Sequence, residues 1–335
     1  MSSVIEMRHG SGTLAMQQLI EQIFLPAFDN PYLNQKNDQA CFAMKAGRLA
    51  MSTDAYVIAP LFFPGGDIGS LAVHGTINDL AMAGATPLYL AASFILEEGF
   101  LITDLQRIVA SMARAAKKSK VVIVTGDTKV VERGKGDGVF ITTTGIGIVP
   151  DGISLSSDRA KVGDKIIVSG FVGDHGIAIM SLRHNLHFHT LIQSDSVALD
   201  DLVQAMIKAV PDIHCLRDPT RGGVATTLNE LAQSSKIGMV IEEAKIPIKI
   251  AVASACELLG LDALYVANEG KLIAICAQQD AAYLLTIMQA HLLGRDAQII
   301  GTVVSDQRCL VQLKTRFGGM RIIDSLAGEL LPRIC

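Results

Sequence analysis

The sequence lacks the features that mark several large functional classes. It contains no run of about 18 or more apolar residues, which a membrane-spanning helix requires. Its 29 Lys and Arg residues stand against 33 Asp and Glu, and the net charge of −4 argues against nucleic acid as the main partner. The first nine residues lack the apolar core of a signal peptide. We therefore expect a soluble cytoplasmic protein that binds neither a membrane nor nucleic acid.

Known cysteine and nucleotide motifs are also missing. The 6 cysteines are scattered without a C-x-x-C pair, which indicates neither a zinc knuckle nor a disulfide framework. There is no Walker motif and no protein-kinase signature. One cysteine differs from the rest, because Cys335 is the last residue and nothing follows its thiol to bury it. A terminal residue is usually frayed and without function, so position alone does not assign Cys335 a role.

The length and composition predict two folded domains. A chain of 335 residues, half of them hydrophobic and 19% charged, exceeds one small core and is unlike a disordered protein. Strand and helix patterns alternate in both halves, which is typical of α/β domains, and a polar stretch at 150–160 connects them. We divide the chain into a Gly-rich N-terminal segment, two α/β domains and a mobile tail: 1–35, 36–150, 151–327 and 328–335.

Glycine-rich stretches precede two of the expected helices. Gly10 and Gly12 stand before a helix expected from Met16 to Phe24, and glycines there let backbone N–H groups approach an anion. Asp67 lies among glycines at the start of a second helix, which we expect to end near Gly84. Asp67 is either a neighbour of a bound phosphate or an ordinary N-cap, and the sequence leaves both open.

Polar residues follow a short apolar strand in the first half. The strand is expected from Val121 to Val124, and Asp127, Thr128 and Lys129 come after it. Sites in α/β proteins form at the carboxyl ends of strands, so these residues are candidates for one. Residues 134–138 are rich in glycine but lead into another strand, which favours a hairpin turn over a phosphate loop.

Further acids lie beside glycines or strand ends in both halves of the chain: Asp54, Asp79, Asp218 and Glu269. Asp54 precedes a strand expected from Tyr56 to Leu61. Asp79 lies in an apolar helix, where a metal ion is one partner for a buried carboxylate and a solvated helix face is the alternative. Asp218 and Arg221 stand with paired glycines before a helix, which has the form of an anion site. Dispersed acids that meet in one cleft suit Mg²⁺ and ATP.

A histidine cluster follows an expected helix in the second half. His184, His187 and His189 could bind a metal through three imidazoles, but no acid or thiol accompanies them. An ordinary polar connection is the alternative. The residues themselves assign this cluster no function.

Taken together, these motifs resemble the HypE family of nickel–iron hydrogenase maturation proteins. The family belongs to a superfamily with aminoimidazole ribonucleotide synthetase and selenophosphate synthetase. The matching stretches span nearly the whole chain in order: 9–12, 52–54, 63–69, 78–79, 125–130, 217–223, 267–271 and 332–335. Each motif is weak alone, and the terminal cysteine makes the set specific.

The resemblance implies a fold, a site and a quaternary structure. The fold would be two α/β domains of the aminoimidazole ribonucleotide synthetase type, with two subunits paired through their N-terminal sheets. The implied catalytic residues are Cys335, Lys129 and Glu269. The implied Mg²⁺ ligands are Asp54, Asp79 and Asp218. The implied ATP-binding residues are Gly10, Gly12, Asp67, Asp127, Thr128 and Arg221.

The resemblance also implies a reaction on the chain end. A carbamoyltransferase, HypF, places a carbamoyl group on the Cys335 sulfur, and ATP-dependent dehydration turns it into a thiocyanate. The cyano group then passes to iron on a HypC–HypD scaffold. We expect the terminal carboxylate to raise the pKa of the thiol and Arg333 to oppose it. Two alternatives remain: another ATP-using enzyme of the superfamily, and a scaffold that carries a cyano group without turnover.

Overall fold

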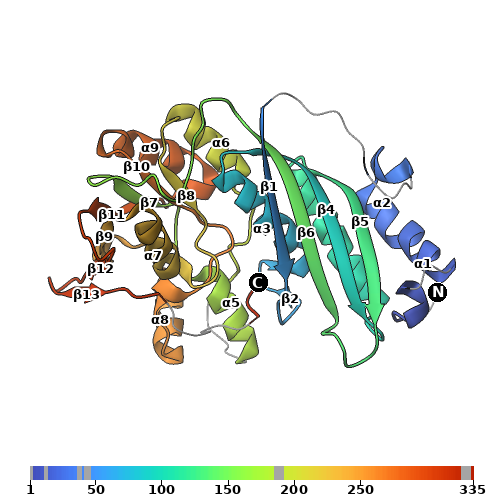
Figure 1. The fold of residues 1–335 in the computed structure, drawn as a ribbon. Coiled ribbons are helices and arrows are strands. Elements are labelled where there is room, and N and C mark those ends of the chain that lie inside the picture. The colour runs from blue at the N-terminus through green and yellow to red at the C-terminus, as the bar shows by residue number, and fades with distance from the viewer. Residues whose placement is uncertain (1–2, 11–13, 36–39, 41–46, 185–191, 326–332) are drawn as a thin grey trace.

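The computed structural model of this chain describes residues 3–10, 14–35, 40, 47–184, 192–325 and 333–335. A four-stranded sheet lies between residues 48 and 149, and a seven-stranded sheet lies between residues 165 and 322. Figure 1 shows the two sheets in separate parts of the molecule, each with its own helices. The expected α/β class with mixed sheets is confirmed.

The first sheet is built from four long strands: β1 (Arg48–Tyr56), β4 (Thr86–Glu97), β5 (Val122–Val131) and β6 (Val139–Val149). Their spatial order is β1-β6-β4-β5, and only β4 and β5 run parallel. A short ribbon of β2 (Phe62–Phe63) and β3 (Gly66–Asp67) precedes the first long helix. Helices α3 (Ile68–Met82) and α4 (Ile102–Lys118) cover one face of the sheet and lie behind it in Figure 1. Alternate strand residues are therefore buried against these helices.

The N-terminal segment adds a helical stretch to the same face. A 3₁₀ turn (Met7–Gly10) precedes α1 (Leu14–Leu19), which continues through a π-helical turn (Ile20–Phe24) into α2 (Leu25–Phe28). The helix expected from Met16 to Phe24 is thus confirmed and is longer at both ends. Phe24 packs on Phe94 of β4 with ring centroids 5.0 Å apart, so apolar contact holds the segment to the sheet.

The opposite face of the four-stranded sheet is uncovered within the described part of the chain (Figure 1). Leu49 and Met51 of β1 are 60% and 71% exposed, and Ile95 of β4 is 43% exposed. Apolar side chains that gather on one exposed sheet face mark an interaction surface rather than a solvated one. We call this face, defined by Leu49, Met51, Ile95 and their strand neighbours, the open face.

Three details of the first domain were predicted wrongly. The strand expected from Tyr56 to Leu61 is β1, which ends at Tyr56, so Asp54 lies inside a strand. β5 runs on to Val131, and Asp127–Lys129 therefore lie within it rather than beyond its end. β5 and β6 form no hairpin, because β4 lies between them in the sheet. In β5, Asp127 and Lys129 lie on the open face, whereas in β1, Ser52 and Asp54 lie on the helix-covered side, where Ser52 donates to Asp79 of α3. Such polar stretches are typical of loops in sequence.

The second sheet has the order β13-β12-β9-β11-β7-β10-β8 and mostly antiparallel neighbours. Its strands are β7 (Lys165–Val168), β8 (Cys215–Arg217), β9 (Gly238–Glu242), β10 (Ile273–Cys276), β11 (Gln298–Val304), β12 (Val311–Lys314) and β13 (Met320–Ile322). Its helices are α5 (Asp174–Arg183), α6 (Asp200–Ala209), α7 (Gly223–Ser235), α8 (Ile250–Leu259) and α9 (Gln278–Ala290). Residues of α6 and α9 share one core cluster and those of α7 another, so helices pack on both faces.

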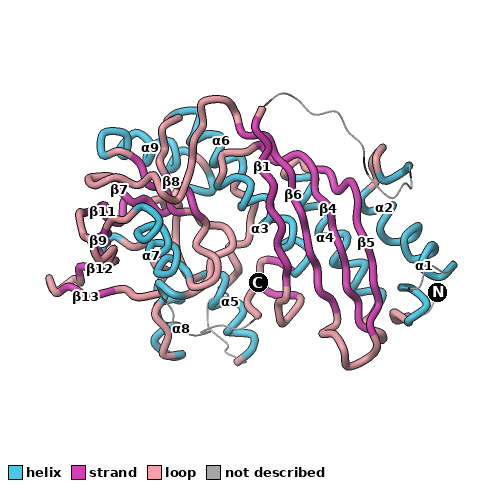
Figure 2. The backbone as a smooth tube through the Cα atoms, in the orientation of Figure 1, coloured by secondary structure: helices cyan, strands magenta, loops and turns pink. Residues whose placement is uncertain are grey.

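The two parts share a core at their junction. The cluster that contains Ile68 and Ile77 of α3 also contains Ile177 of α5 and Val252 of α8. Figure 2 shows loops gathered between the seven-stranded part and β1, close to the C-terminus of the chain. Within the described residues, no helix is long and apolar enough to cross a bilayer.

Candidate active site

The end of the chain is docked at the junction between the two parts. The backbone N–H of Val57 donates to a C-terminal oxygen of Cys335 at 3.0 Å, and that of Ala59 donates to the carbonyl of Arg333 at 3.3 Å. These pairs run in antiparallel register, so the last residues extend alongside the segment that follows β1. The side chain of Ile334 is only 3% exposed and belongs to the shared core. The chain end is therefore bound, and Cys335 is partly buried against the shared core.

The surroundings of Cys335 are charged as well as buried. Burial raises the pKa of the Cys335 thiol, and the charges of Glu269, Asp54 and Asp218 raise it further. Arg221 is the cation that lowers it. These side chains come from distant parts of the sequence, and the fold brings their charges close enough to act on the thiol.

Arg333 does not take the role that we expected for it. It forms an ion pair with Asp137, in the turn between β5 and β6. The guanidinium that acts on the thiol pKa is that of Arg221 instead. Arg333 thus ties the docked chain end to the first domain.

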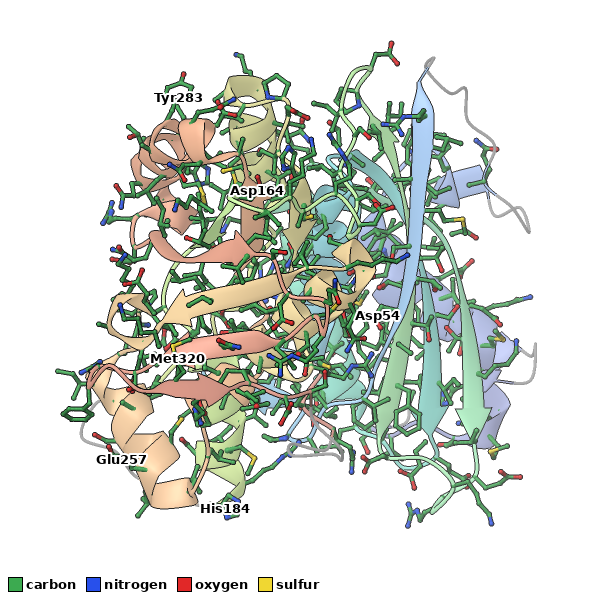
Figure 3. All side chains as sticks on the ribbon, turned by 60° about the vertical axis from the view of Figure 1, so that its left-hand side comes forward. Asp54, Asp164, His184, Glu257, Tyr283 and Met320 are labelled. Carbon is green, nitrogen blue, oxygen red and sulfur yellow. The ribbon has the colours of Figure 1, made fainter. Side chains whose placement is uncertain are left out.

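A cavity of about 680 Å³ opens beside the docked end, lined among others by Asp54, Asp79, Asp218 and Arg221. β1 carries Asp54, α3 carries Asp79, and the loop before α7 carries Asp218 and Arg221. Figure 3 shows Asp54 where the two parts meet. Asp79 Oδ2 accepts a hydrogen bond from the Ser52 hydroxyl at 2.6 Å. The structure therefore brings the three expected metal ligands and one expected ATP ligand to one cavity.

The carboxylates of this cavity repel one another. Burial raises the pKa of Asp218 to about 7, and the charges of Asp79 and Asp54 add to the shift. Burial likewise raises the pKa of Asp79, with Asp54 contributing. Among the residues that the structure describes, no three His, Cys, Asp or Glu side chains are close enough to hold a metal ion by themselves. The donor set suits a cation such as Mg²⁺, which takes one or two carboxylates and fills its remaining sites with water and phosphate oxygens.

Glu269 is buried, and its charge acts on the docked thiol by raising the thiol pKa. It is 3% exposed, and its Oε1 has no hydrogen-bond partner among the described residues. Burial raises the pKa of Glu269 well above its usual value, and the charges of Asp218 and Asp195 raise it further. A buried carboxyl with a free oxygen can accept a proton from a group placed beside it.

Asp195 holds the backbone at Glu269. Its Oδ1 accepts the Glu269 N–H at 3.1 Å, and its Oδ2 lies 3.1 Å from the Lys271 ammonium in a buried ion pair. Asn78 of α3 adds a contact from the first domain, because its side-chain amide donates to the carbonyls of Val197 and Glu269 at 3.1 and 3.4 Å. The position of Glu269 is therefore fixed by both domains.

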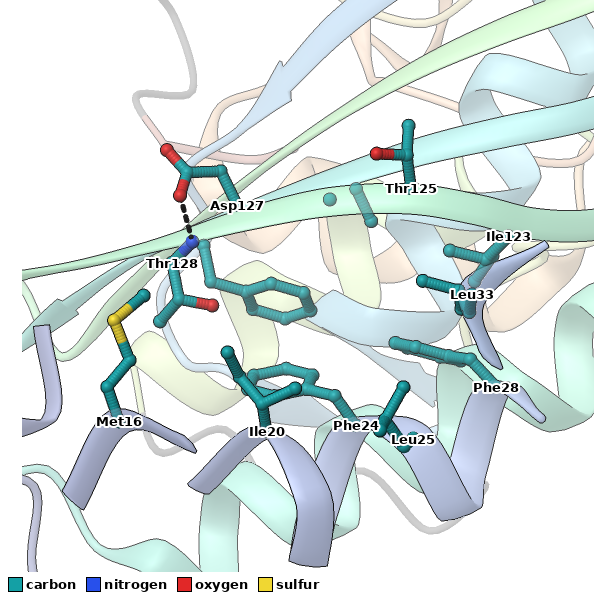
Figure 4. Close-up of a pocket in the computed structure, with 13 residues that line it drawn as sticks. Met16, Ile20, Phe24, Leu25, Phe28, Leu33, Ile123, Thr125, Asp127 and Thr128 are labelled. Carbon is teal, nitrogen blue, oxygen red and sulfur yellow. Dashed lines mark hydrogen bonds between the residues drawn. The ribbon is translucent and has the colours of Figure 1, made fainter. Parts of the chain in front are cut away.

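Other expected ATP and catalytic residues lie on β5, at the far edge of the sheet from β1. Asp127 and Lys129 are exposed and form an ion pair at 3.0 Å. Thr128 points to the other face of β5, into an apolar pocket of about 120 Å³ under the N-terminal helices (Figure 4). β6 and β4 separate β5 from β1, a distance of roughly 14 Å at the usual strand spacing. Within one chain, Lys129 and Asp127 are not brought to Cys335.

Two expected phosphate ligands have structural partners. Gly10 packs closely on β5, where a Cβ atom would lie 2.6 Å from the Val130 nitrogen. Asp67 is the N-cap of α3, and its Oδ1 accepts the N–H groups of Gly69 and Ser70 at 2.8 and 3.0 Å. Gly12 lies outside the described residues. The roles of these three in binding ATP stay predictions.

The histidine cluster is described only in part. His184 is exposed at the end of α5, and Figure 3 shows it at the edge of the molecule, away from Asp54. His187 and His189 lie outside the described residues. The possible metal site at this cluster stays untested.

The fold and this site have counterparts among known proteins. The family model "AIR synthase related protein, N-terminal domain" matches residues 36–149, and the corresponding C-terminal domain model matches residues 161–314. Carbamoyl dehydratase HypE of Cupriavidus necator is 63% identical over 335 residues, which cover 100% of this chain and 95% of that protein. This chain belongs to the HypE family.

Solved HypE structures agree with this membership. A crystal structure of hydrogenase maturation protein HypE in complex with ATP has a TM-score of 0.95 at 48% identity, covering 98% of this chain and 99% of that one. HypE in a HypE–HypF complex has a TM-score of 0.81 at 48% identity, covering 92% and 99%. The expected fold type and the expected family are both confirmed.

Several residues at this HypE-family site were not predicted from the sequence. Asp195 accepts the N–H of Glu269, His175 contacts the carbonyl of Ile334, and Ser194 contacts the His175 ring. Asp195 and Ser194 lie in no glycine-rich motif. His175 follows Gly173-Asp174 at the start of α5, and an imidazole among apolar residues was the one signal available for it.

Proposed function

We propose that this chain is an ATP-dependent dehydratase whose substrate is a carbamoyl group carried on its own Cys335. The observation that supports the proposal best is the docked chain end, which places the Cys335 thiol among Glu269, Asp218 and Arg221. A scaffold that only carried a cyano group would have no need of a buried carboxyl with a free oxygen next to the thiol. The relatives' name, carbamoyl dehydratase, agrees with this activity.

The proposed reaction overcomes a poor leaving group. Transfer of the terminal phosphoryl group of ATP to the amide oxygen of the S-carbamoyl group turns that oxygen into part of a phosphate leaving group. Loss of the two N–H protons and departure of phosphate then leave a thiocyanate on the sulfur, with ADP and phosphate as products. Glu269 is the proposed proton acceptor, because burial raises its carboxyl pKa toward the range of a general base.

Burial of the chain end serves this chemistry. An activated carbamoyl group is attacked by water, so the reaction needs a site from which water is excluded. The side chain of Ile334, the residue before Cys335, is buried in the shared core and is shielded from water there. A substrate carried on the chain end can enter such a site, react and then leave for a partner without being released.

ATP and Mg²⁺ are the proposed cosubstrate and metal. Asp54, Asp79 and Asp218 would hold the metal, and their mutual repulsion is the observation that favours a cation there. When bound, Mg²⁺ would neutralise charge on the phosphates. Arg221, which lines the same cavity, would bind a phosphate directly. Gly10, Gly12 and Asp67 remain proposed contributors from the first domain.

A homodimer would complete the site. Asp127, Thr128 and Lys129 lie on the β5 edge of the sheet, whereas Asp54 lies on the β1 edge. If two open faces pack about a two-fold axis, the β5 edge of each subunit can lie next to the β1 edge of its partner. The exposed apolar side chains of the open face supply a reason for that packing. Lys129 would then act in the site of the partner subunit.

The proposed partners follow the path of the carbamoyl group. A HypE–HypF complex has been solved for a relative, and we propose HypF as the carbamoyltransferase that loads Cys335 here. A HypC–HypD scaffold is the proposed acceptor of the cyano group for the hydrogenase iron. Both partners would require Cys335 to leave its docked position, since the docked chain end is hydrogen-bonded to Val57 and Ala59 and partly buried against the shared core.

The test is the intact mass of the protein after incubation with HypF, carbamoyl phosphate and ATP. The wild type should gain one carbamoyl group and then lose one water, and Cys335→Ala should do neither. Cys309→Ala, which removes a partly exposed cysteine outside the site, is the matched control and should behave as the wild type. Hydrolysis of ATP with no modification of Cys335 would overturn the proposal and favour a superfamily enzyme that acts on a free small molecule.

A further inference from the structure

The docked chain end is held through its backbone, and helix α5 supplies the side chains that hold it. Nε2 of His175, near the start of α5, lies 2.8 Å from the carbonyl oxygen of Ile334. Arg183, the last residue of α5, donates to the carbonyl of Arg333 and, through Nε, to that of Ala59 at 2.7 Å. One helix therefore binds two successive carbonyls of the chain end, which lies near α5 in Figure 1.

The hydrogen bonds of His175 determine which tautomer its ring adopts. A carbonyl oxygen only accepts, so Nε2 must carry the hydrogen that it donates to Ile334. Nδ1 is then the acceptor, and the Ser194 hydroxyl 2.8 Å away donates to it. The Ser194 oxygen in turn accepts the N–H of Ser196 at 3.1 Å, which leaves its own hydrogen for the ring.

His175 is also rigid and neutral. It has 0% exposure, and its ring packs edge-on against Phe63 with centroids 5.5 Å apart. Burial lowers the pKa of the ring, so the neutral form with both nitrogens occupied persists at neutral pH. A ring fixed in place and in tautomer gives its acceptor a defined position.

These contacts bind the main chain and leave the sulfur of Cys335 alone. The carbonyls of Arg333 and Ile334 and the terminal oxygen of Cys335 all have donors, and none of these donors binds the thiol. Such a set of contacts holds the chain end in the same way whether the thiol is free or carries a group. Of the side-chain contacts from α5, that of His175 is the nearest to the reacting residue, one peptide bond away.

We propose that His175 is a positioning residue for the dehydration: its Nε2–H holds the Ile334 carbonyl, which places the Cys335 sulfur beside Glu269, and Ser194 maintains the required tautomer. The inference rests on the proposed function, because it assigns His175 a part in that reaction. Docking favours dehydration, and undocking favours loading by the carbamoyltransferase. Loss of the His175 contact should therefore change these two rates in opposite directions, which a general loss of folding would not do.

A matched pair of variants tests the contact. In His175→Gln the side-chain amide reaches about the position of Nε2 and can still donate to Ile334. In His175→Asn the shorter amide occupies about the position of Nδ1, where it meets Ser194 but does not reach the chain end. Both variants are polar and of similar size, so they differ mainly in the contact of interest. His74→Gln is the control, because His74 is a half-buried histidine that contacts the same segment through Ser196, at 3.0 Å.

Two readouts are needed, and the first does not depend on any enzymatic activity. Alkylation of Cys335 by iodoacetamide is followed on the Lys-C peptide 315–335, in which Cys335 is the one cysteine. His175→Asn should raise that rate about tenfold, the effect of one lost buried hydrogen bond, whereas His175→Gln and His74→Gln should stay near the wild type. The second readout is single-turnover dehydration of preloaded protein, which should fall about tenfold in His175→Asn alone while HypF-dependent loading rises.

The outcomes separate the inference from the function on which it rests. If the two His175 variants alkylate and dehydrate at equal rates, the positioning role is overturned. If wild-type protein is loaded but never dehydrated, the proposed function fails, and the alkylation rates still decide whether His175 holds the chain end. Should His175→Asn not fold, Ser194→Ala keeps the ring and removes its tautomer partner. Ser194→Ala must then raise the alkylation rate of Cys335 above that of Ser194→Thr, which keeps a hydroxyl. Equal rates for these two variants would contradict the inference.

Discussion

The backbone N–H of Val57 lies 3.0 Å from a terminal oxygen of Cys335, so the last residue of the chain is hydrogen-bonded to the segment that follows β1. β1 also carries Asp54, one of the acids around the thiol. A strand and its continuation thus supply both a charged group of the site and the backbone donors that hold its substrate. Contacts to the main chain suit a segment that must bind and leave repeatedly.

Ile334→Ala should weaken docking more than it weakens the fold. The side chain is 3% exposed, and truncating a buried Ile typically costs about 2–5 kcal/mol. In the proposed cycle the chain end undocks while the domains stay folded, so this loss should appear as a smaller docked fraction. We expect single-turnover dehydration to fall at least tenfold, with a melting temperature close to that of the wild type.

Ile334→Val is the matched control for that experiment. It removes one methylene at a typical cost of about 0.5–1.5 kcal/mol. Its dehydration rate should therefore lie between that of the wild type and that of Ile334→Ala. A rate for Ile334→Ala equal to that of the wild type would mean that the apolar contact does not hold the chain end.

The docked thiol should resist alkylation well above neutral pH. Burial, and then the charges of Glu269 and Asp54, raise the pKa of Cys335, because each disfavours the thiolate that reacts with iodoacetamide. In the native protein the alkylation rate should keep rising through pH 9.5 without a plateau. In protein unfolded by urea it should level off near the ordinary thiol pKa of about 8.5. Arg221→Gln should slow native alkylation further, and a native plateau near pH 8.5 would contradict the docked position.

The sequence was sufficient for elements that are buried on both faces. β7 (Lys165–Val168) and β11 (Gln298–Val304) are largely apolar runs that stop at turn residues, which is the sequence pattern of a buried strand. β1 and β5 were misplaced, since Ser52–Asp54 and Thr125–Lys129 are polar and were interpreted as loops. In the structure these residues alternate between two faces of a sheet, one of which is open. Some of these side chains are polar because they lie on the open face, and others because they belong to the candidate site at the edge of the sheet.

The site residues also divide into those that the sequence identified and those that it did not. Asp54, Asp79, Asp218 and Glu269 were found because each lies beside glycines or other polar residues in a short motif. His175 and Ser194 were not, since their importance depends on partners that the sequence does not place next to them. The His175–Ile334 contact joins residues 159 positions apart, and no local pattern encodes such a pair. Contacts made by a docked chain end become visible when the fold is known.

Glu269→Gln should abolish most dehydration and retain ATP binding. The amide has nearly the same shape but cannot accept a proton, and loss of a general base usually costs about 10²–10⁴-fold in rate. The measurement is single-turnover conversion of preloaded Cys335, with ATP affinity followed separately. Glu230→Gln is the control, since Glu230 lines the cavity of Asp54 and Asp218 from an exposed position where it pairs with Arg217 at 2.7 Å. Equal activity of the two variants would remove Glu269 from the catalytic group.

Met51→Glu should convert the proposed dimer into monomers. Met51 is 71% exposed on the open face, and a charge there would be desolvated against the partner's apolar side chains. Light scattering should give the dimer mass for the wild type and the monomer mass for the variant. Dehydration should be lost with the dimer, because Lys129 of the partner would no longer reach the site. Phe317→Glu, at a fully exposed apolar residue of the second domain, should leave both properties unchanged.

His74 should make the protein sensitive to mild acid. Burial lowers its pKa from 6.5 to about 4, with the charge of Lys118 acting in the same direction. The unfolded chain therefore binds a proton more readily than the folded one between these values. The stability that the neutral ring contributes is complete above pH 6.5 and is lost as the pH falls toward 4. The loss between pH 7 and pH 5 should be roughly 2 kcal/mol in unfolding free energy.

Urea unfolding of the wild type and His74→Gln at pH 7 and pH 5 checks this estimate. Gln cannot take up a proton, so the variant should lose less stability than the wild type over the same interval. All other titrating groups, including the buried His175, are common to both proteins and cancel in the comparison. Equal losses would mean that His74 gains access to water or to a proton without unfolding. Its hydrogen bond to Ser196 would then be more mobile than the 3.0 Å contact implies, and the segment that supports both Glu269 and His175 would be less rigid as well.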